Sequence, residues 1–313
     1  MESTDVTALA PTSEQQRGAG PAEGGAGSQR GRWAGTYLPM VPFFAYVALF
    51  LLLPTLYVLV GAFQSADGSP SLENISTVLR EPRYLAAFGR SVQLSFVSAL
   101  IGAILGGLFA WAVSVGGPGG RLRQISVAAS GVLAQFGGVM LAFAFLATFG
   151  LTGLVTIVLK DTVGIDLAAD SSWIYGMTGL TIVYTYFQIP LMIIVFLPAI
   201  DGLRQEWWEA STSLGGSSWS YWRHVGGPIL APSFLGALLL LFANAFSAYA
   251  TAAALVSQGS PIVPLQIAEA MSGEVVQGQA NLGKALALGM IIVVVVVMTL
   301  YALLQRRASR WLR

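Results

Sequence analysis

Side chains that could do covalent chemistry are few and scattered in this sequence. It has no cysteine and a single histidine, His224, so thiolate chemistry is excluded and no cluster of metal ligands is indicated. No nucleophile is paired with a neighbouring base, and no GxxxxGK(S/T) loop is present to hold ATP phosphates. An intrinsic enzyme is therefore disfavoured, and neither a cofactor nor a nucleic-acid partner is expected. The chemistry to look for is non-covalent recognition.

The strongest candidate for recognition is the stretch 205–228, QEWWEASTSLGGSSWSYWRHVGGP, which we call the elbow. It is polar, although it lies between two long apolar segments. Trp207, Ala210 and Leu214 recur at i, i+3 and i+7, which predicts a helix over 205–214 with one apolar side. Together with Glu209, these residues predict a contact in which a helix enters the groove of a soluble partner. The alternative is an interfacial loop whose aromatic rings lie among lipid headgroups.

The middle and end of the elbow carry signals for a turn. Gly215 and Gly216 favour a helix stop, because glycine adopts left-handed backbone angles at little cost. Ser217 or Ser218 can cap a second short helix that runs to about residue 224. Pro228 then begins the next apolar segment, where its missing N–H does no harm. The elbow is therefore predicted to be a helix-turn-helix.

A second set of polar residues lies inside the apolar segments. Asn244, Ser247 and Thr251 follow each other at i, i+3 and i+7, with Tyr249 nearby, so a helix would place the three on one side. Polar groups within a bilayer usually face the bundle interior or a water-filled path. We therefore take these residues, with Gln188 from another segment, as candidates for a translocation path. The alternative for the stripe is hydrogen bonding that holds helices together.

Composition indicates the class of protein in which both sets of residues occur. Of the 313 residues, 55% are hydrophobic and 10% charged, whereas a soluble domain carries about a quarter charged residues. Six apolar segments approach the roughly 20 residues needed to cross a bilayer. They cover 39–62, 91–115, 127–149, 174–199, 229–256 and 285–304, and Gln135, Gly137 and Gly138 interrupt the third. Between them, 64–90 predicts an external helix leading into the second segment, and Gly102 and Gly106 predict close helix packing.

The two ends of the chain are polar. Residues 1–35 are rich in Gly, Ala, Ser, Glu and Gln without periodicity, which predicts a disordered cytoplasmic tail rather than a signal peptide. Residues 36–313 then form the transmembrane domain. The other end is expected to contact anionic membrane lipid through its basic side chains, Arg306, Arg307, Arg310 and Arg313.

The distribution of lysine and arginine predicts the orientation. With both termini inside, most of the 16 basic residues fall inside, and the exceptions are Arg80, Arg83, Arg90, Lys160 and Lys284. The elbow then lies in the cytoplasm.

The elbow also resembles a known motif. Glu209-Ala210, Gly215 and Pro228 match the EAA loop of bacterial ABC importer permeases, while Ser211 stands in place of the second Ala. Two further departures are Val225 for Ile and Gly227 for Leu. From about residue 38 to 307 the chain resembles the MetI-like permeases. Within them it is most similar to the branch that serves polyamines, 2-aminoethylphosphonate and ferric iron. The segments SLENISTVLREPRYLAAFGRSVQLSF, FQIPLMIIVFLPAIDGL and LLLFANAFSAYATAAALV carry this wider similarity.

The resemblance implies an all-α integral membrane fold with six transmembrane helices and a cytoplasmic coupling-helix loop. It implies a bacterial plasma-membrane importer that moves a small polar or charged solute. The implied partners are a pair of ATP-binding ABC subunits, a second permease of the same or a related chain, and an extracytoplasmic solute-binding protein. The residues it assigns to ATPase coupling are Trp207, Glu209, Ala210, Leu214, Gly215 and Pro228.

The rival interpretation is a secondary, ion-coupled transporter without an ATPase partner. Such a transporter would normally place ionisable groups inside its spans, and the six predicted segments contain no Asp, Glu, Lys or Arg. A membrane enzyme is disfavoured because the sequence offers neither a nucleophile with a base nor a metal set.

Overall fold

The computed structural model describes residues 40–65, 67–116, 119–165, 167, 172–256, 261–272 and 280–309, with the side chains of 172 and 304–309 excepted. The predicted tail, 1–35, and the predicted basic end lie outside the described residues or side chains. The chain divides into two compact units, Met1–Pro54 and Thr55–Arg313, and each is described by itself.

The first unit contains the start of one long apolar helix. It comprises α2 (Val41–Val47), the π-helical turn η2 (Ala48–Leu52) and the first residues of α3 (Leu53–Ala62). Its large apolar side chains are exposed on every side, among them Phe43, Tyr46 and Phe50. A helix that is apolar all round suits a lipid environment. The predicted first segment, 39–62, is confirmed by the helix Val41–Ala62.

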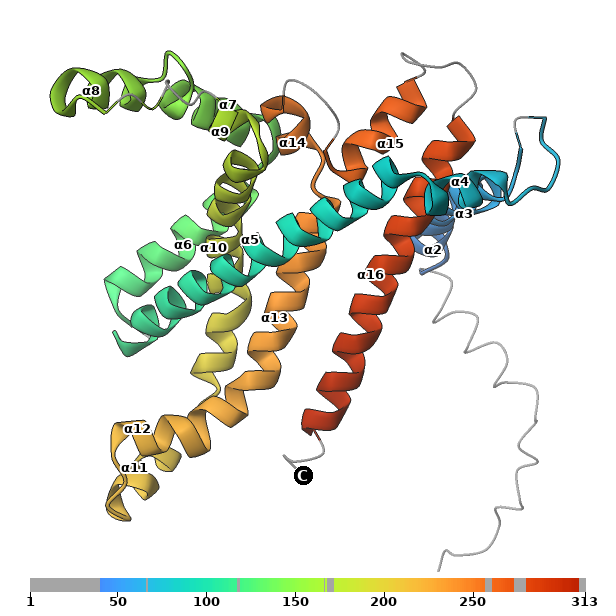
Figure 1. Ribbon diagram of the computed structural model, residues 1–313. Helices are drawn as coiled ribbons and strands as arrows, with labels where there is room; N and C mark the ends of the chain where they lie inside the picture. The colour runs from blue at the N-terminus through green and yellow to red at the C-terminus, as the bar shows by residue number, and fades with distance from the viewer. Residues whose placement is uncertain are drawn as a thin grey trace, which may run out of the picture. The chain divides into compact units, whose positions relative to one another are not determined.

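The second unit is built from helices within the described part of the chain (Figure 1). After α3 come α4 (Glu73–Arg80), α5 (Pro82–Val115), α6 (Arg121–Gln135), α7 (Gly138–Phe149), α8 (Leu154–Val163), α9 (Ser172–Tyr175) and α10 (Met177–Asp201). The elbow contributes α11 (Gln205–Ser213), α12 (Ser218–Tyr221) and the π-helical turn η3 (Trp222–Gly226). The chain continues as α13 (Gly227–Ser247), α14 (Ala250–Leu255), α15 (Val263–Ser272) and α16 (Ala280–Ser309). Across both units, six described helices have the length and composition to cross a membrane.

Glycines let α5 and α10 pack closely at the centre of this unit. A Cβ atom on Gly102 would lie 2.4 Å from the Gln188 Cβ, and one on Gly106 would lie 2.6 Å from the Ile189 carbonyl oxygen. These two positions therefore have no room for a side chain, which confirms the predicted small-residue packing. Buried side chains of α13 pack in the same apolar cluster as those of α5 and α10.

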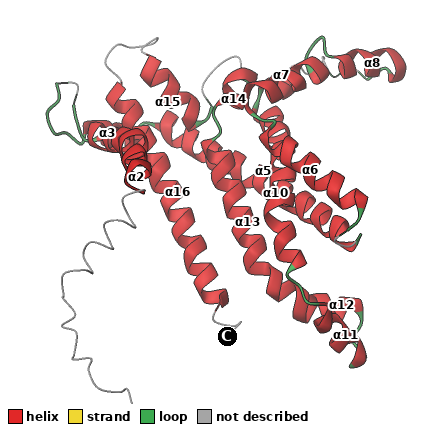
Figure 2. Cartoon of the chain, turned by 180° about the vertical axis from the view of Figure 1, so that it is seen from behind, coloured by secondary structure: helices red, strands yellow, loops and turns green. Residues whose placement is uncertain are grey.

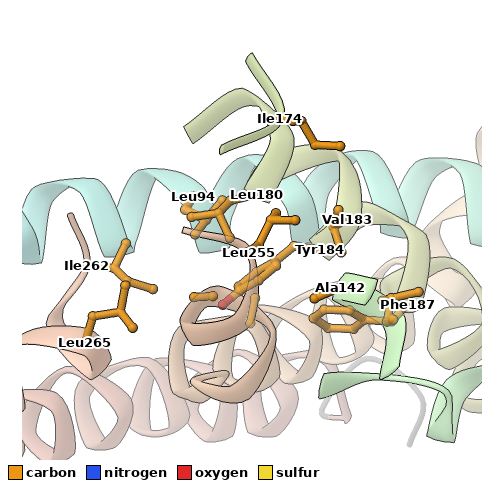
Figure 3. Packing of buried hydrophobic residues seen from close by; sticks show 13 residues of the cluster. Leu94, Ala142, Ile174, Leu180, Val183, Tyr184, Phe187, Leu255, Ile262 and Leu265 are labelled. Carbon is orange, nitrogen blue, oxygen red and sulfur yellow. The ribbon is translucent and has the colours of Figure 1, made fainter. Parts of the chain in front are cut away.

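A cluster of buried apolar residues lies at the end of the unit opposite the elbow. Figure 3 shows Tyr184 of α10 among Leu94 of α5, Leu180 and Leu255 of α14. Each of these side chains is at most 2% exposed. This cluster fixes the end of α10 against the short helix α14, and the polar cavity described below lies beside it.

Two predicted segments are broken in the structure. The third, 127–149, is not one helix, because Gly137 is extended and Gly138 adopts a left-handed φ of 68° between α6 and α7. The long apolar span here is Gly138–Val163. The fifth, 229–256, ends as a helix at Ser247, and Ala248 is extended before α14 begins. Both breaks lie at the same end of the unit (Figures 1 and 2).

Two other helices begin earlier than predicted. The helix α5 begins at Pro82, a favourable first helical residue, so residues 82–90 of the predicted external helix are the start of the span itself, and α4 is a separate helix before it. The helix α16 begins at Ala280 and therefore includes Lys284, which is 8% exposed. The Lys284 Nζ donates to the Asn281 Oδ1 at 3.0 Å and lies 4.1 Å from the centre of the Tyr57 ring. The helices are thus not free of charge, although the predicted segments were.

Candidate functional site: the elbow and the polar cavity

The first arm of the elbow is the predicted helix. It begins at Gln205 and ends at Ser213, and the left-handed turn falls at Gly215 with a φ of 79°. The next residue, Gly216, donates its N–H to the Ser211 carbonyl at 2.9 Å. A Cβ on Gly216 would lie 2.7 Å from the Ser211 Oγ, so both glycines are required by the geometry of the turn.

The second arm starts as predicted but does not stop. The Ser217 Oγ accepts the Ser220 N–H at 3.2 Å and so caps α12. The sequence predicted an end near residue 224, yet α12, η3 and α13 form one continuous helical run over Ser218–Ser247. The chain avoids a break at Pro228 by passing through the π-helical turn η3 just before it. Directly after that turn, a Cβ on Gly227 would lie 2.5 Å from the Trp222 carbonyl oxygen, so glycine replaces the usual Leu here.

The two arms enclose an open, largely apolar groove of about 500 Å³. The predicted coupling residues Trp207, Ala210 and Leu214 line it together, as their spacing indicated. The side chain of Leu214 is 89% exposed. The remaining lining residues come from the first arm, the turn, the second arm and the start of α13: Ser211, Gly216, Ser220, Val225 and Ile229.

The predicted polar contact, Glu209, lies beside this groove rather than in its lining. Its side chain is exposed, and the Glu209 Oε1 accepts a hydrogen bond from the Gln205 Nε2 at 2.9 Å. The guanidinium of Arg204 lies 5.9 Å from the centre of the Trp207 ring at the start of the same helix. The first arm therefore offers apolar area and a carboxylate side by side.

Several aromatic residues of the elbow contact the protein itself. Trp208 packs edge-on against Tyr221 with ring centres 5.0 Å apart, and Tyr221 packs against Trp222 at 5.6 Å. Trp222 in turn meets Trp111 of α5 at 6.4 Å. Trp219, by contrast, is 73% exposed. The sequence did not predict the contact with Trp111, because no local spacing connects two residues so far apart along the chain.

An ion pair lies just before the elbow. The Arg123 guanidinium of α6 donates two hydrogen bonds to the Asp201 carboxylate at the end of α10. The distance from Nη1 to Oδ1 is 2.9 Å. These hydrogen bonds raise the pKa of Arg123 above its usual value. The pair joins α6 to the point where α10 leaves the bundle, and sequence reasoning did not find it.

The predicted path residues of the fifth segment meet in one cavity, but not as a helical stripe. The cavity of about 260 Å³ lies where α13 breaks, and its lining includes Asn244, Ser247, Tyr249 and Thr251. The stripe prediction was wrong beyond Ser247, because the helix ends there and the chain turns before α14. The turn brings the later residues back to the same cavity, whose opposite wall is Ala134, Gly137, Gly138 and Phe187.

Two side chains of α10 define this region. The Tyr184 hydroxyl donates to the Ala248 carbonyl oxygen at 2.7 Å and so satisfies a backbone group freed by the break. Gln188 is fully buried, and its Nε2 donates to the Leu241 carbonyl oxygen at 2.7 Å. Gln188 is not among the residues that line this cavity. It joins α10 to α13, and its neighbour Phe187 lines the cavity instead.

No protein-family model matches the chain. Curated relatives nevertheless share part of it. A spermidine/putrescine transport system permease protein PotB of Haemophilus influenzae is 24% identical over 212 residues, 66% of this chain and 72% of that protein. A probable sulfate transport system permease protein cysT of Marchantia polymorpha is 26% identical over 175 residues, 54% of this chain and 56% of that protein. The chain spans 18% of the length of a thiamine transport system permease protein ThiP of Brucella suis.

Solved structures show the fold. A bacterial ABC transporter for import of the acidic polysaccharide alginate matches with a TM-score of 0.66 at 15% identity, over 90% of this chain and 96% of that one. The MetNI methionine ABC transporter matches with a TM-score of 0.54 at 14% identity, over 76% of this chain and 99% of that one. The resemblance to ABC importer permeases of the MetI-like type is therefore confirmed, as is the all-α fold. The six apolar helices and these relatives support a multi-pass protein of the bacterial inner membrane.

Proposed function

We propose that this chain is the membrane-spanning permease subunit of an ATP-driven importer for a small polar or charged solute. The observation that carries the proposal is the elbow. It is a helix-turn-helix continuous with α13 and joined to α10 by a short link, and it presents an open apolar groove beside Glu209. The exposed apolar side of α11 is suited to burial in a cleft of a soluble partner, which is the helix-in-groove mode of contact.

The partner at the elbow is an ATP-binding subunit, present as a pair, and ATP hydrolysis takes place there rather than in this chain. A second permease, either a copy of this chain or a relative, and an extracytoplasmic solute-binding protein complete the assembly. In this arrangement both termini and the elbow face the cytoplasm. A structural neighbour, a bacterial alginate ABC transporter in complex with a periplasmic protein that binds an alginate pentasaccharide, supports the binding-protein part of this composition.

Transport requires two arrangements of the bundle that open to opposite sides of the membrane. ATP can shift their balance only if its binding makes different contacts in the two arrangements. The elbow supplies such contacts: a displacement of α11 is passed to α10 and α13, which it joins. The polar cavity at the other end of α13 serves as part of the path, with Asn244, Ser247, Tyr249 and Thr251 as neutral hydrogen-bonding groups.

The resemblance points to polyamines, 2-aminoethylphosphonate and ferric iron as candidate solutes, and the spermidine/putrescine relative supports the first. Two other relatives are named for sulfate and thiamine, solutes whose charges differ from that of a polyamine. Isolation of the complex from membranes, followed by identification of the co-purifying binding protein and its ligand, would identify the solute.

The elbow is tested by reversing its charge. Glu209→Lys is expected to leave membrane insertion intact and to lower the yield of co-purifying ATPase, or to leave hydrolysis without uptake, because the carboxylate faces the partner. Glu73→Lys is the matched control, since Glu73 is an exposed acidic residue in the first turn of α4, at the opposite end of the unit. Normal uptake and normal ATPase yield in Glu209→Lys would refute the proposal.

A further test separates this proposal from an ion-coupled transporter. Uptake driven by an ATPase stops when ATP is depleted and continues when only the ion gradient is collapsed. Among the described residues, Lys284 of α16 is the buried charged side chain, and an ion-coupled mechanism would be expected to use it. Its ammonium is held by Asn281 and the Tyr57 ring, and no carboxylate lies within ion-pair distance of it among the described residues.

A further inference from the structure

The elbow is joined by the chain to α10 and α13, but not to α5. Yet α5 packs along both of those helices, and its last turns lie at the elbow end of the unit (Figure 1). Trp111 lies one turn before the end of α5 at Val115. Any movement of the elbow that is to reach α5 directly must pass through side chains at this point.

Aromatic rings form a continuous line from the first arm of the elbow to α5. The line runs from Trp208 to Tyr221, from Tyr221 to Trp222 and from Trp222 to Trp111, with ring centres 5.0, 5.6 and 6.4 Å apart. The planes of each pair are 77° to 79° apart, which is the edge-to-face arrangement that aromatic rings favour. Rings are rigid and have few rotatable bonds, so a displaced ring pushes its neighbour rather than folding away.

The middle of this line is held firmly by its surroundings. Tyr221 is 5% exposed, and Trp222 packs against the buried cluster shared by α5, α10 and α13. A Cβ on Gly226 would lie 2.9 Å from the Trp222 ring, so the following turn closes directly on that ring. Trp222 also belongs to the π-helical turn η3, which couples its position to the start of α13.

We propose that Trp111 is a positioning residue through which the elbow moves the cytoplasmic end of α5, by way of Trp222, Tyr221 and Trp208. This inference rests on the proposed function, because it requires an ATP-bound partner to displace the elbow. It extends that function from the two helices that the elbow joins to a third helix that it only contacts. The bundle would then respond through α5, α10 and α13 together.

The absence of cysteine from the chain makes a direct measurement practical. Spin labels on introduced cysteines would report two distances in the complex purified with its ATPase: Val115→Cys at the end of α5, and Ser213→Cys at the end of α11, each against Val295→Cys on α16. Both Val115 and Val295 are more than half exposed, so labels fit there. The probe is a non-hydrolysable ATP analogue with Mg²⁺.

In the otherwise unchanged chain, both distances are expected to shift when the analogue is added. In Trp111→Leu the Ser213 distance should still shift, whereas the Val115 shift should be lost, because the last ring of the line is missing. Trp111→Phe retains a ring and should restore the Val115 shift. Phe109→Leu is the matched control: it removes an exposed ring from the same turn of α5 that contacts no other ring in the described part of the chain, and both shifts should remain.

An undiminished Val115 shift in Trp111→Leu would overturn the inference and leave the proposed function standing. Loss of both shifts in that variant would also overturn it, because Trp111 would then act on docking itself. If neither distance shifts in the unchanged chain while the ATPase is bound, the proposed function fails together with the inference.

Discussion

At the scale of single residues, the surroundings of a polar side chain separate structural from functional roles. Gln188 and Asn244 are both amides in apolar helices, and the sequence placed both on the path. The structure buries Gln188 completely and gives its Nε2 a backbone partner on α13. It leaves Asn244 exposed at the lining of the polar cavity. Sequence alone could not separate them, because periodicity does not reveal which neighbour covers a residue.

This difference predicts opposite outcomes for two substitutions. Asn244→Leu should lower solute uptake while the assembly stays intact, because it replaces a hydrogen-bonding group of the cavity by an apolar one. Gln188→Met should leave uptake near normal and change stability by about 1 kcal/mol or less, since it removes one hydrogen bond together with the Oε1 acceptor, which has no partner among the described residues. Uptake assays and thermal unfolding of the purified complex measure the two effects. Unchanged uptake in Asn244→Leu would exclude Asn244 from the path.

At the scale of elements, local signals predicted the elbow well and the helix breaks poorly. The first helix, the glycine turn and the Ser217 cap are all confirmed, since each depends on residues next to one another in the chain. The break after Ser247 has no such signal, because alanine at 248 is a strong helix former. Its carbonyl is instead satisfied by Tyr184 from a distant helix. Tertiary contacts therefore determine this boundary, as they do the contact between Trp111 and Trp222.

The hydroxyl of Tyr184 is accordingly predicted to stabilise the break. Tyr184→Phe should leave the Ala248 carbonyl without its partner and cost about 1–3 kcal/mol, the usual penalty for such a group. Amide hydrogen exchange in α14 should become faster, because that helix begins at the break. Tyr186→Phe serves as the control, since Tyr186 lies two residues further along α10 and packs its ring against Phe145. Equal exchange in the two variants would contradict the assigned role.

At the scale of the whole molecule, composition predicted the class of fold. The apolar content indicated a bundle of membrane-spanning helices, and six such helices are present among the described residues. The predicted bounds of the spans were less reliable, because charged residues near helix ends, such as Arg83 and Lys284, were placed in the external segments between the spans. A lysine can lie within a helix when its ammonium has partners, and Asn281 and Tyr57 provide them here.

The orientation of the bundle is a prediction that the cysteine-free chain can test simply. A membrane-impermeant maleimide should label Ser213→Cys in the elbow only after the membrane is permeabilised. It should label Leu72→Cys in intact spheroplasts, because Leu72 is 65% exposed and precedes α4 at the opposite end of the unit. The reverse pattern would place the elbow outside and remove it from any cytoplasmic ATPase.

The helix α13 gives the molecule a built-in lever. It has 21 residues, so at 1.5 Å of rise per residue it is a rod of about 30 Å. Its first residue continues from the elbow, and its last borders the polar cavity. If the rod tilts by roughly 10° about one tip, simple trigonometry on the same length moves the other tip by roughly 5 Å. A shift of that size exceeds the width of a water molecule. A small tilt that begins at the elbow is therefore enough to change the shape of the polar cavity.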